Sequence, residues 1–434
     1  MNIDDIINSI DSNNLDIAFG RVVNISAVTL SAVGLDVAVG DIVRIESAQK
    51  LYTVLGMVTV LKDGLFVIVP FSFIDGFKIN DKVFLQRDGL TVKCGNGLLG
   101  RVVNALGEPI DDLGKIRDLD TNAPINKESM SPLDRGIIDK KFATGVKAID
   151  SMLTCGKGQK VGIFAGSGVG KSTLMGMIVQ GCEATIKVIA LVGERGREIP
   201  EFIHYNLNNN LENTVIVTAT SDESPLMRKY AAFTAMTIAE YFRDKGYDVL
   251  LMMDSVTRFA MAQREIGLST GEPPVSRGYP PSVFALLPQL MERAGNSKKG
   301  SITAFFTVLV DGDDLNDPIA DQSRSILDGH IVLTRDLTEQ GFYPPINILK
   351  SASRVIDKVV TKEHYNDFLK LKRVLSLIKE NEVLIRVGAY KKGMDLELDS
   401  AIAKKEKARE FLTQGTLEKY SFDEIVANLR KVLI

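Results

Sequence analysis

The sequence predicts an α/β protein in three parts, with a parallel sheet in its central part. Between residues 160 and 350, near-continuous apolar runs alternate with segments of helical apolar spacing, a pattern typical of parallel strands covered on both faces. Residues 17–95 instead hold short β-branched runs separated by turn residues, and helical spacing dominates beyond about residue 355. These changes of period predict an N-terminal β-barrel, a central α/β domain and a C-terminal α-helical domain.

The composition of the chain argues against some classes of partner and some cellular locations. The 434 residues carry a formal net charge of −3, which disfavours a protein that coats nucleic-acid phosphates, so we expect no nucleic-acid partner. Three cysteines without a C-x-x-C pair fit a reducing compartment. No apolar run approaches the roughly 20 residues of a membrane helix, and the acidic start "MNIDDIINSIDSNN" is unlike a signal peptide. We therefore expect a cytoplasmic protein with peripheral membrane association only.

The N-terminal part contains two predicted elements. Residues 1–14 carry isoleucines at helical spacing, which predicts a short amphipathic segment that either docks on its own chain or binds a partner. Residues 15–95 are predicted to form the barrel, because turn pairs such as Asp63-Gly64 and Asp88-Gly89 separate β-branched runs.

The central and C-terminal parts divide at about residue 354. Residues 96–354 are predicted to form the α/β domain, and helix-like stretches separate several of its strands. The predicted strands are "QKVGIFAG", "IKVIALVGE", "NTVIVTATSD", "YDVLLMMD", "SITAFFTVLVDGDD" and "GHIVLTRD". Residues 355–434 are predicted to be helical, and their last helix opens with Ser421 and Glu424 at the spacing of a capping box.

A phosphate-binding loop is predicted at residues 165–172, "AGSGVGKS". It follows an apolar run and precedes a helix-like segment, which is the context that such a loop requires. Its backbone N–H groups would converge on phosphate oxygens, and the helix N-terminus would add a favourable field. We expect Lys171 to reach the outer phosphates and Ser172 to ligate Mg²⁺. The predicted nucleotide-binding residues of the loop are Gly166, Ser167, Gly168, Val169, Gly170, Lys171, Ser172 and Thr173.

Two carboxylates end predicted strands of the same sheet. The run "IKVIALV" ends in Gly193-Glu194, and the run "DVLLMM" ends in Asp254. Ligands of open parallel sheets bind at the carboxyl ends of the strands, so both side chains are expected near the phosphate loop. Asp254 fits the acid that orients Mg²⁺, and Glu194 fits the base that polarises an attacking water. Either residue taken alone would be better explained as a turn or N-cap carboxylate.

Seven motifs occur in the order found in the type III protein-export ATPases, which are related to the catalytic subunits of rotary ATP synthases. They are "GSGVGKS", "GERGRE", "DSVTRFAMAQREI", "GEPPVSRGYPPSVF", "GSITAFFTVLV", "DPIADQSRSILDGHIVLTR" and "YPPINILKSASR". The chain most resembles the flagellum-specific export ATPases of this family. The resemblance runs from about residue 20 to about residue 355 and continues more loosely to residue 434.

The resemblance implies a RecA-like P-loop nucleotide domain that hydrolyses ATP with Mg²⁺. It implies that Glu194 is the catalytic carboxylate and that Asp254 is the acid beside Mg²⁺. Arg354 resembles the arginine finger that reaches the γ-phosphate bound to a neighbouring subunit. Tyr343 resembles the residue that stacks near adenine.

The resemblance also implies partners and a location. Six copies are expected to form a ring at the cytoplasmic face of the inner-membrane export apparatus. The expected partners are export-gate membrane proteins, a stator-like regulator, a central stalk protein and chaperone–cargo complexes. The proline-rich stretch 271–284 is predicted to be a stiff loop, either facing the ring channel through Arg277 and Tyr279 or packing within the fold.

Four other functions are weighed against flagellar export. The ATPase of a virulence injectisome shares the fold and most of the motifs. A catalytic rotary ATPase subunit carries different sequence in the region of residues 260–284. A non-hydrolysing rotary subunit lacks the carboxylate found here as Glu194. A hexameric RNA helicase needs a basic, aromatic N-terminal surface, whereas residues 15–95 are apolar and β-branched.

Overall fold

The computed structural model describes residues 18–47, 52–310 and 314–434. The predicted amphipathic segment 1–14 lies outside the described residues. The chain divides into two compact units. One contains the N-terminal region up to Thr91 together with Glu223–Met227 and Ala262–Ser282, and the other contains the rest of the chain.

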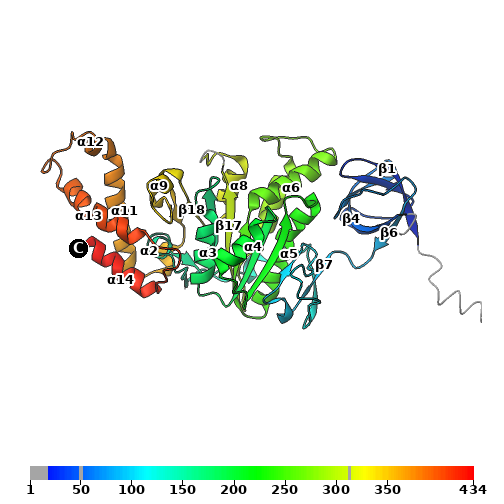
Figure 1. Ribbon diagram of the computed structural model, residues 1–434, viewed down its shortest axis with the longest axis horizontal. Helices are drawn as coiled ribbons and strands as arrows, with labels where there is room; N and C mark the ends of the chain where they lie inside the picture. Colours follow the sequence, from blue (N-terminus) through cyan, green and yellow to red (C-terminus); the bar gives the residue numbers. More distant parts are fainter. Residues whose placement is uncertain (1–17, 48–51, 311–313) are drawn as a thin grey trace, which may run out of the picture. The chain divides into compact units, whose positions relative to one another are not determined.

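Six antiparallel strands of the first unit close into a barrel, in the order β1-β2-β5-β4-β3-β6 (Figure 1). Their bounds are β1 Phe19–Ile25, β2 Leu30–Val33, β3 Ile42–Glu46, β4 Thr53–Lys62, β5 Leu65–Pro70 and β6 Lys82–Gln86. Inward-facing aliphatic side chains such as Leu30 and Ile68 are fully buried. Asp63 and Gly64 both have positive φ between β4 and β5, as a tight hairpin turn requires. The predicted barrel is confirmed.

The proline-rich stretch 271–284 belongs largely to the same unit. Tyr279 is only 6% exposed, and the Arg264 guanidinium lies over its ring at 5.4 Å. Tyr279 donates its N–H to Ser276 and accepts one from Val275 through its carbonyl. The expectation that Tyr279 offers an exposed contact group is therefore wrong, because its ring is used for packing. Pro281 opens a helix, where a proline is tolerated in the first turn.

The second unit is built on a nine-stranded sheet with the main order β19-β18-β12-β17-β15-β13-β14-β8. The predicted strands of the central part all lie in this sheet and pair in parallel, as expected. The strand bounds are β8 Val102–Val103, β12 Lys160–Ala165, β13 Ile186–Glu194, β14 Thr214–Thr220, β15 Asp248–Asp254, β16 Gly295–Asn296, β17 Ser301–Leu309, β18 Gly329–Val332 and β19 Ala352–Ser353. Strands β16 and β19 are antiparallel to their neighbours.

Helices and short strands complete the central part of the chain. The helices are α2 Lys147–Met152, α3 Lys171–Gly181, α4 Glu198–Glu201, α5 Pro225–Asp244, α6 Val256–Ser269, α7 Pro281–Met291, α8 Pro318–Ile326, α9 Arg335–Glu339 and α10 Ile356–Val359. The short strands are β7 Thr91–Cys94, β9 Thr121–Pro124, β10 Lys141–Phe142 and β11 Cys155–Gly156. A single π-helical turn, η3, follows α4 at Phe202–Asn206.

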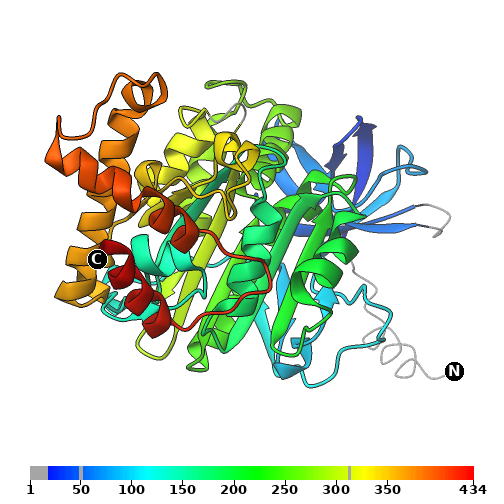
Figure 2. The ribbon, with the colours of Figure 1, turned by 60° about the vertical axis from the view of Figure 1, so that its left-hand side comes forward.

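The C-terminal region is helical, as predicted, and its helices gather at one end of the second unit (Figures 1 and 2). They are α11 Lys362–Glu380, α12 Glu382–Arg386, α13 Leu396–Leu412 and α14 Phe422–Leu433. The capping box of Ser421 and Glu424 is present at the start of α14. Among the helices of the described residues, none has the length and apolarity needed to cross a membrane.

A buried ion pair joins α5 to the segment after α7. The Arg293 guanidinium donates to both carboxylate oxygens of Glu240, at 3.1 and 2.7 Å, and their side chains are 1% and 5% exposed. The same guanidinium also donates to the Ile125 carbonyl at 2.9 Å. On the surface, Arg373 and Glu397 form a second bidentate pair with similar distances but with more than half of each side chain exposed.

Glu240→Ala should destabilise the fold strongly, because it leaves a buried guanidinium without its carboxylate. Removing one partner of a buried pair typically costs about 3–5 kcal/mol, and urea denaturation followed by circular dichroism will measure the loss. Glu397→Ala is the matched control and should have little effect, since water replaces the lost partner. Equal shifts in the two variants would contradict this account of the buried pair.

Candidate functional site

The phosphate loop connects β12 to α3 in the second unit. Gly168 and Gly170 have φ of 78° and 91°, a left-handed conformation that favours glycine. Gly170 is the N-cap of α3, and Lys171 is the first residue of that helix. Ser167, Ser172 and Thr173 are exposed at the loop, whereas Val169 is buried beneath it. The loop therefore presents backbone N–H groups and a helix N-terminus to solvent, as an anion site requires.

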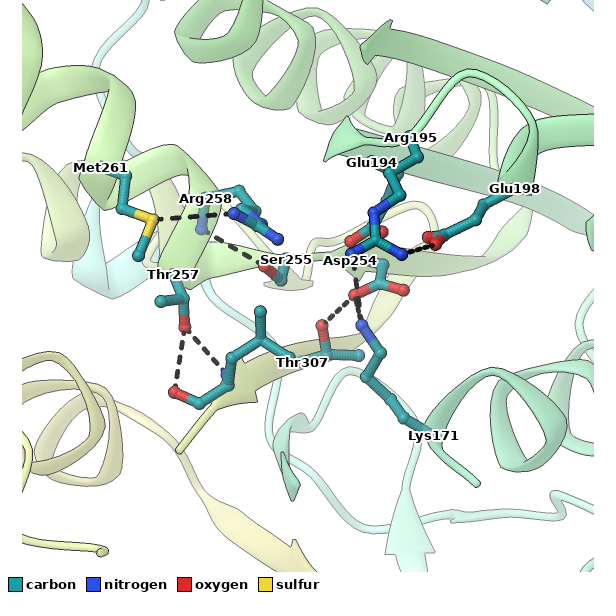
Figure 3. A network of polar contacts seen from close by, with 11 residues as sticks. Lys171, Glu194, Arg195, Glu198, Asp254, Ser255, Thr257, Arg258, Met261 and Thr307 are labelled. Atoms are coloured by element: carbon teal, nitrogen blue, oxygen red, sulfur yellow. Dashed lines mark hydrogen bonds and ion pairs between the residues drawn. The ribbon is translucent and has the colours of Figure 1, made fainter. Parts of the chain in front are cut away.

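Lys171 lies between two carboxylates at the carboxyl ends of neighbouring strands (Figure 3). Its Nζ contacts Asp254 Oδ1 and lies 3.8 Å from Glu194 Oε1. Strands β13 and β15 pair in parallel with Leu191 opposite Asp254, so both strands end at the same edge. All three side chains are at most 14% exposed. The structure thus places one cation between two nearly buried acids.

A β-bulge determines the position of Glu194. The register between β13 and β14 shifts between Val192 and Glu194, and Gly193 at the shift has a φ of 69°. A Cβ at Gly193 would approach Arg258 Cβ to 3.0 Å, so both the backbone conformation and the close contact favour glycine here. Bulges commonly re-aim a side chain next to a functional site.

The Glu194 carboxyl has a strongly perturbed pKa. Burial and the negative charge of Asp254 raise its pKa to about 7, against the opposing effect of the Lys171 cation. The Glu198 carboxyl raises it further. A carboxyl group with a pKa near neutral pH is suited to accept a proton during a reaction.

Several polar residues at the site were missed by the sequence reasoning. Thr307, fully buried on β17, donates its hydroxyl hydrogen to Asp254 Oδ1 at 2.6 Å. Arg195 contacts Glu198 at 3.4 Å and is mostly exposed beside Glu194. Arg258 follows Asp254 on α6 (Figure 3), and its Nε is buried without a hydrogen-bond partner among the described residues. The sequence signal for all three residues was only that they occur in the quoted motifs "GSITAFFTVLV", "GERGRE" and "DSVTRFAMAQREI".

Tyr343 lies in a loop beside the phosphate loop. A Cβ built at Gly170 would lie 3.8 Å from Pro345 Cδ, so residues 343–345 adjoin the start of α3. The Tyr343 side chain is 44% exposed, and its carbonyl accepts the Gln414 N–H at 2.9 Å. The ring is therefore available to a ligand near the phosphate loop.

Arg354 lies away from the Lys171 site of the same chain. It follows β19, whose Ser353 pairs with Gly329 at the beginning of β18, and Gly329 pairs in turn with Val161 near the beginning of β12. The phosphate loop begins four residues later, at the opposite end of β12, which is roughly 13 Å at 3.3 Å per strand residue. The Arg354 guanidinium donates to the Arg324 carbonyl at 3.3 Å. Arg354 therefore lies at the edge of the sheet formed by the amino ends of β12 and β18.

The oxygen donors at the site suit Mg²⁺. Asp254 supplies a carboxylate at the end of β15 and Ser172 supplies a hydroxyl in the first turn of α3. Mg²⁺ prefers oxygen ligands and usually combines one or two protein groups with phosphate and water. The residues present therefore fit this ion together with a phosphate-bearing ligand.

The chain matches two protein-family models in succession. Residues 145–353 match the nucleotide-binding domain of the ATP synthase alpha/beta family. Residues 360–431 match the T3SS EscN ATPase C-terminal domain. The two matches together span every strand of the sheet that carries the site except β8, and nearly all of the C-terminal helical region.

Named relatives match almost the whole chain. It is 57% identical to a flagellum-specific ATP synthase of Helicobacter pylori strain J99 over 96% of this chain and 95% of the relative. It is 43% identical to a type 3 secretion system ATPase of Xanthomonas euvesicatoria over 95% of this chain and 94% of the relative. The fold resembles the assembled ATPase EscN of the enteropathogenic E. coli type III secretion system, with a TM-score of 0.91, 44% identity, and coverage of 96% of this chain and 100% of that chain. EscN has also been solved in complex with its central stalk EscO, and that structure matches with a TM-score of 0.88.

Thr307→Val should weaken Mg²⁺-dependent nucleotide binding, because Asp254 loses the hydroxyl that orients it. Loss of such an outer partner typically costs 10–100-fold in metal affinity, which titration of Mg²⁺ against a fluorescent nucleotide will measure. Thr303→Val is the control, since Thr303 is equally buried on β17 and bonds the Gly158 N–H instead. An unchanged Mg²⁺ requirement in Thr307→Val would show that Asp254 does not depend on this bond.

Proposed function

The chain belongs to the type III protein-export ATPases of the ATP synthase alpha/beta family, and we propose that it powers the export of flagellar proteins. As a member of that family it is an ATP hydrolase. The assignment to flagellar export is supported by the relatives, because the flagellum-specific enzyme from H. pylori shares 57% identity and the secretion ATPase from X. euvesicatoria shares 43%. The ATPase of a virulence injectisome is the second candidate, favoured by the likeness to EscN, by the match of residues 360–431 to the EscN C-terminal domain and by the X. euvesicatoria relative.

In this proposal, Glu194 accepts a proton from the water that attacks the γ-phosphate. The arrangement that supports it is a carboxyl group with a pKa of about 7, held 3.8 Å from the lysine of the phosphate loop. Lys171 and the backbone N–H groups of residues 166–173 hold the phosphates. Asp254 and Ser172 would hold Mg²⁺, which would supply positive charge against the phosphate oxygens. Tyr343 lies against the adenine base.

We assign Arg354 to the site of a neighbouring subunit. Its position at the amino-end edge of the sheet, roughly 13 Å of strand from the phosphate loop, argues against action on its own chain's nucleotide. An arginine finger supplied by a neighbour accelerates phosphoryl transfer about 10³–10⁵-fold in well-studied cases. The active form would then be a closed homohexameric ring with six such interfaces, consistent with the assembled state of EscN.

The remaining assignments follow from the same family. We propose domain boundaries of 15–95 for the barrel, 96–354 for the RecA-like domain and 355–434 for the helical domain. We also propose that a central stalk protein enters the ring, as EscO does with EscN, and that export-gate proteins, a stator-like regulator and chaperone–cargo complexes bind at the cytoplasmic face of the inner membrane. The ring-channel role of residues 271–284 would then rest on Arg277 and not on Tyr279.

Chromosomal Glu194→Gln should abolish secretion of flagellar hook and filament proteins and halt swimming, because bound ATP is no longer hydrolysed. The substitution keeps the size of the side chain, so the protein should accumulate normally on immunoblots. Mass spectrometry of culture supernatants measures the secreted set. Continued motility with loss of a different secreted set would identify an injectisome ATPase, and unchanged secretion would exclude an export role.

Mixing two inactive variants tests the assignment of Arg354. Arg354→Ala and Glu194→Gln should each hydrolyse little ATP alone. In rings assembled from equal amounts, about a quarter of the interfaces join an intact Glu194 site to an intact Arg354 of the neighbour, so activity should return to about that fraction of wild type. If Arg354 served the site of its own chain, no mixture would recover activity.

A further inference from the structure

A π-helical turn connects the segment after Glu194 to the helix that carries the phosphate loop. After Glu194 the chain passes through α4 into η3, Phe202–Asn206, and η3 packs against α3. A π turn inserts one residue into a helix and frequently occurs at functional sites. The final residue of this turn, Asn206, faces α3.

Asn206 contacts α3 at three levels. Its side-chain Nδ2 donates to the Ser172 carbonyl at 3.1 Å, in the first turn of α3. Its own carbonyl accepts from Gln180 Nε2 at 2.6 Å, near the end of the helix. Between them, a Cβ at Gly176 would lie only 2.8 Å from Asn206 Cβ and 2.9 Å from its Nδ2.

Gly176 is required for packing and not for backbone conformation. It lies in the middle of α3 and is not among the residues with positive φ. Glycine in a helix interior costs about 1 kcal/mol relative to alanine. A buried glycine at the middle of the three places where Asn206 contacts α3 is explained by the space that the Asn206 side chain occupies.

These contacts complete a closed circuit around the site. The chain runs from Glu194 through α4 and η3 to Asn206. The Asn206 side chain donates to the Ser172 carbonyl, and Nζ of the adjacent Lys171 lies 3.8 Å from Glu194 Oε1. The circuit links the element that binds phosphate to the strand end that carries the carboxylate. Displacement of α3 would change the distance between a bound phosphate and Glu194 without removing any phosphate-binding group.

We propose that Asn206 is a positioning residue for ATP hydrolysis, which holds the first turn of α3 at a fixed distance from Glu194. The absence of a side chain at Gly176 leaves the space that the Asn206 side chain occupies. In this role Asn206 acts through the Ser172 main chain, to which its side chain donates. This inference rests on the proposed roles of Glu194 and of the phosphate loop. Small errors in the placement of reacting groups cost up to about 100-fold in rate, and they lower kcat when nucleotide binding is intact.

The test compares Asn206→Ala with Gln180→Ala in the assembled full-length protein. Both variants lose one hydrogen bond between η3 and α3, but only Asn206→Ala releases the Ser172 end. We expect kcat to fall at least about tenfold in Asn206→Ala, with KM and the affinity for a fluorescent nucleotide near wild type and with kcat retained in Gln180→Ala. Equal kcat in the two variants, or a raised KM at unchanged kcat, would overturn the proposal.

Gly176→Ala provides a second route if Asn206→Ala folds poorly. Helix propensity alone predicts a stabilised and fully active protein, whereas the positioning role predicts a lowered kcat with nucleotide affinity retained. Full activity in Gly176→Ala would therefore also contradict the proposal. Glu194→Gln in the same assay distinguishes a failure of the proposed function from a failure of the Asn206 inference. Hydrolysis that survives in Glu194→Gln would reject the proposed function itself and not only the role of Asn206.

Discussion

The arrangement on which the site depends is a single ammonium group between two nearly buried carboxylates. Lys171 contacts Asp254 and approaches Glu194, and its positive charge opposes the rise in the Glu194 pKa that burial and Asp254 cause. Parallel pairing of β13 with β15 brings the two strand ends together, and the left-handed glycines of the phosphate loop start α3 where Lys171 reaches both. The sheet order, the bulge at Gly193 and the Thr307 hydroxyl all act on this one cluster.

The same sheet explains why one chain is incomplete as a catalyst in the proposed mechanism. The phosphate loop and both acids lie at the carboxyl ends of the strands, whereas Arg354 follows an antiparallel edge strand that ends at the opposite side. A monomer would bind nucleotide through Lys171 but lack the neighbour's Arg354, which in this mechanism stabilises the transferring phosphate, so hydrolysis would depend on assembly. An enzyme of this design would couple ATP use to ring formation, which suits a role at a fixed export apparatus.

Local patterns predicted much of this structure, and long-range packing accounts for what they did not predict. Residue spacing along the chain was sufficient to predict four features, because each depends on residues close in sequence. These are the phosphate loop, the two strand-end carboxylates, the barrel and the capping box of α14. Thr307 required knowledge of which strands are neighbours, because it meets Asp254 only through the pairing of β15 with β17. Asn206 depends on a π turn that propensity does not signal. Tyr279 was one of two contact groups suggested for a channel-facing loop, with packing within the fold as the alternative, and packing against Arg264 buries it.

Titration of the Glu194 carboxyl tests the central electrostatic claim most directly. Infrared difference spectra of the nucleotide-free protein, with Glu194→Gln as the blank, would follow the protonated C=O band across pH. The structure predicts protonation below, and ionisation above, a midpoint of about 7, and Lys171→Met should move that midpoint to higher pH because the cation that favours the charged form is lost. A midpoint near the ordinary glutamate value of about 4.3, or one that Lys171→Met leaves unchanged, would contradict it.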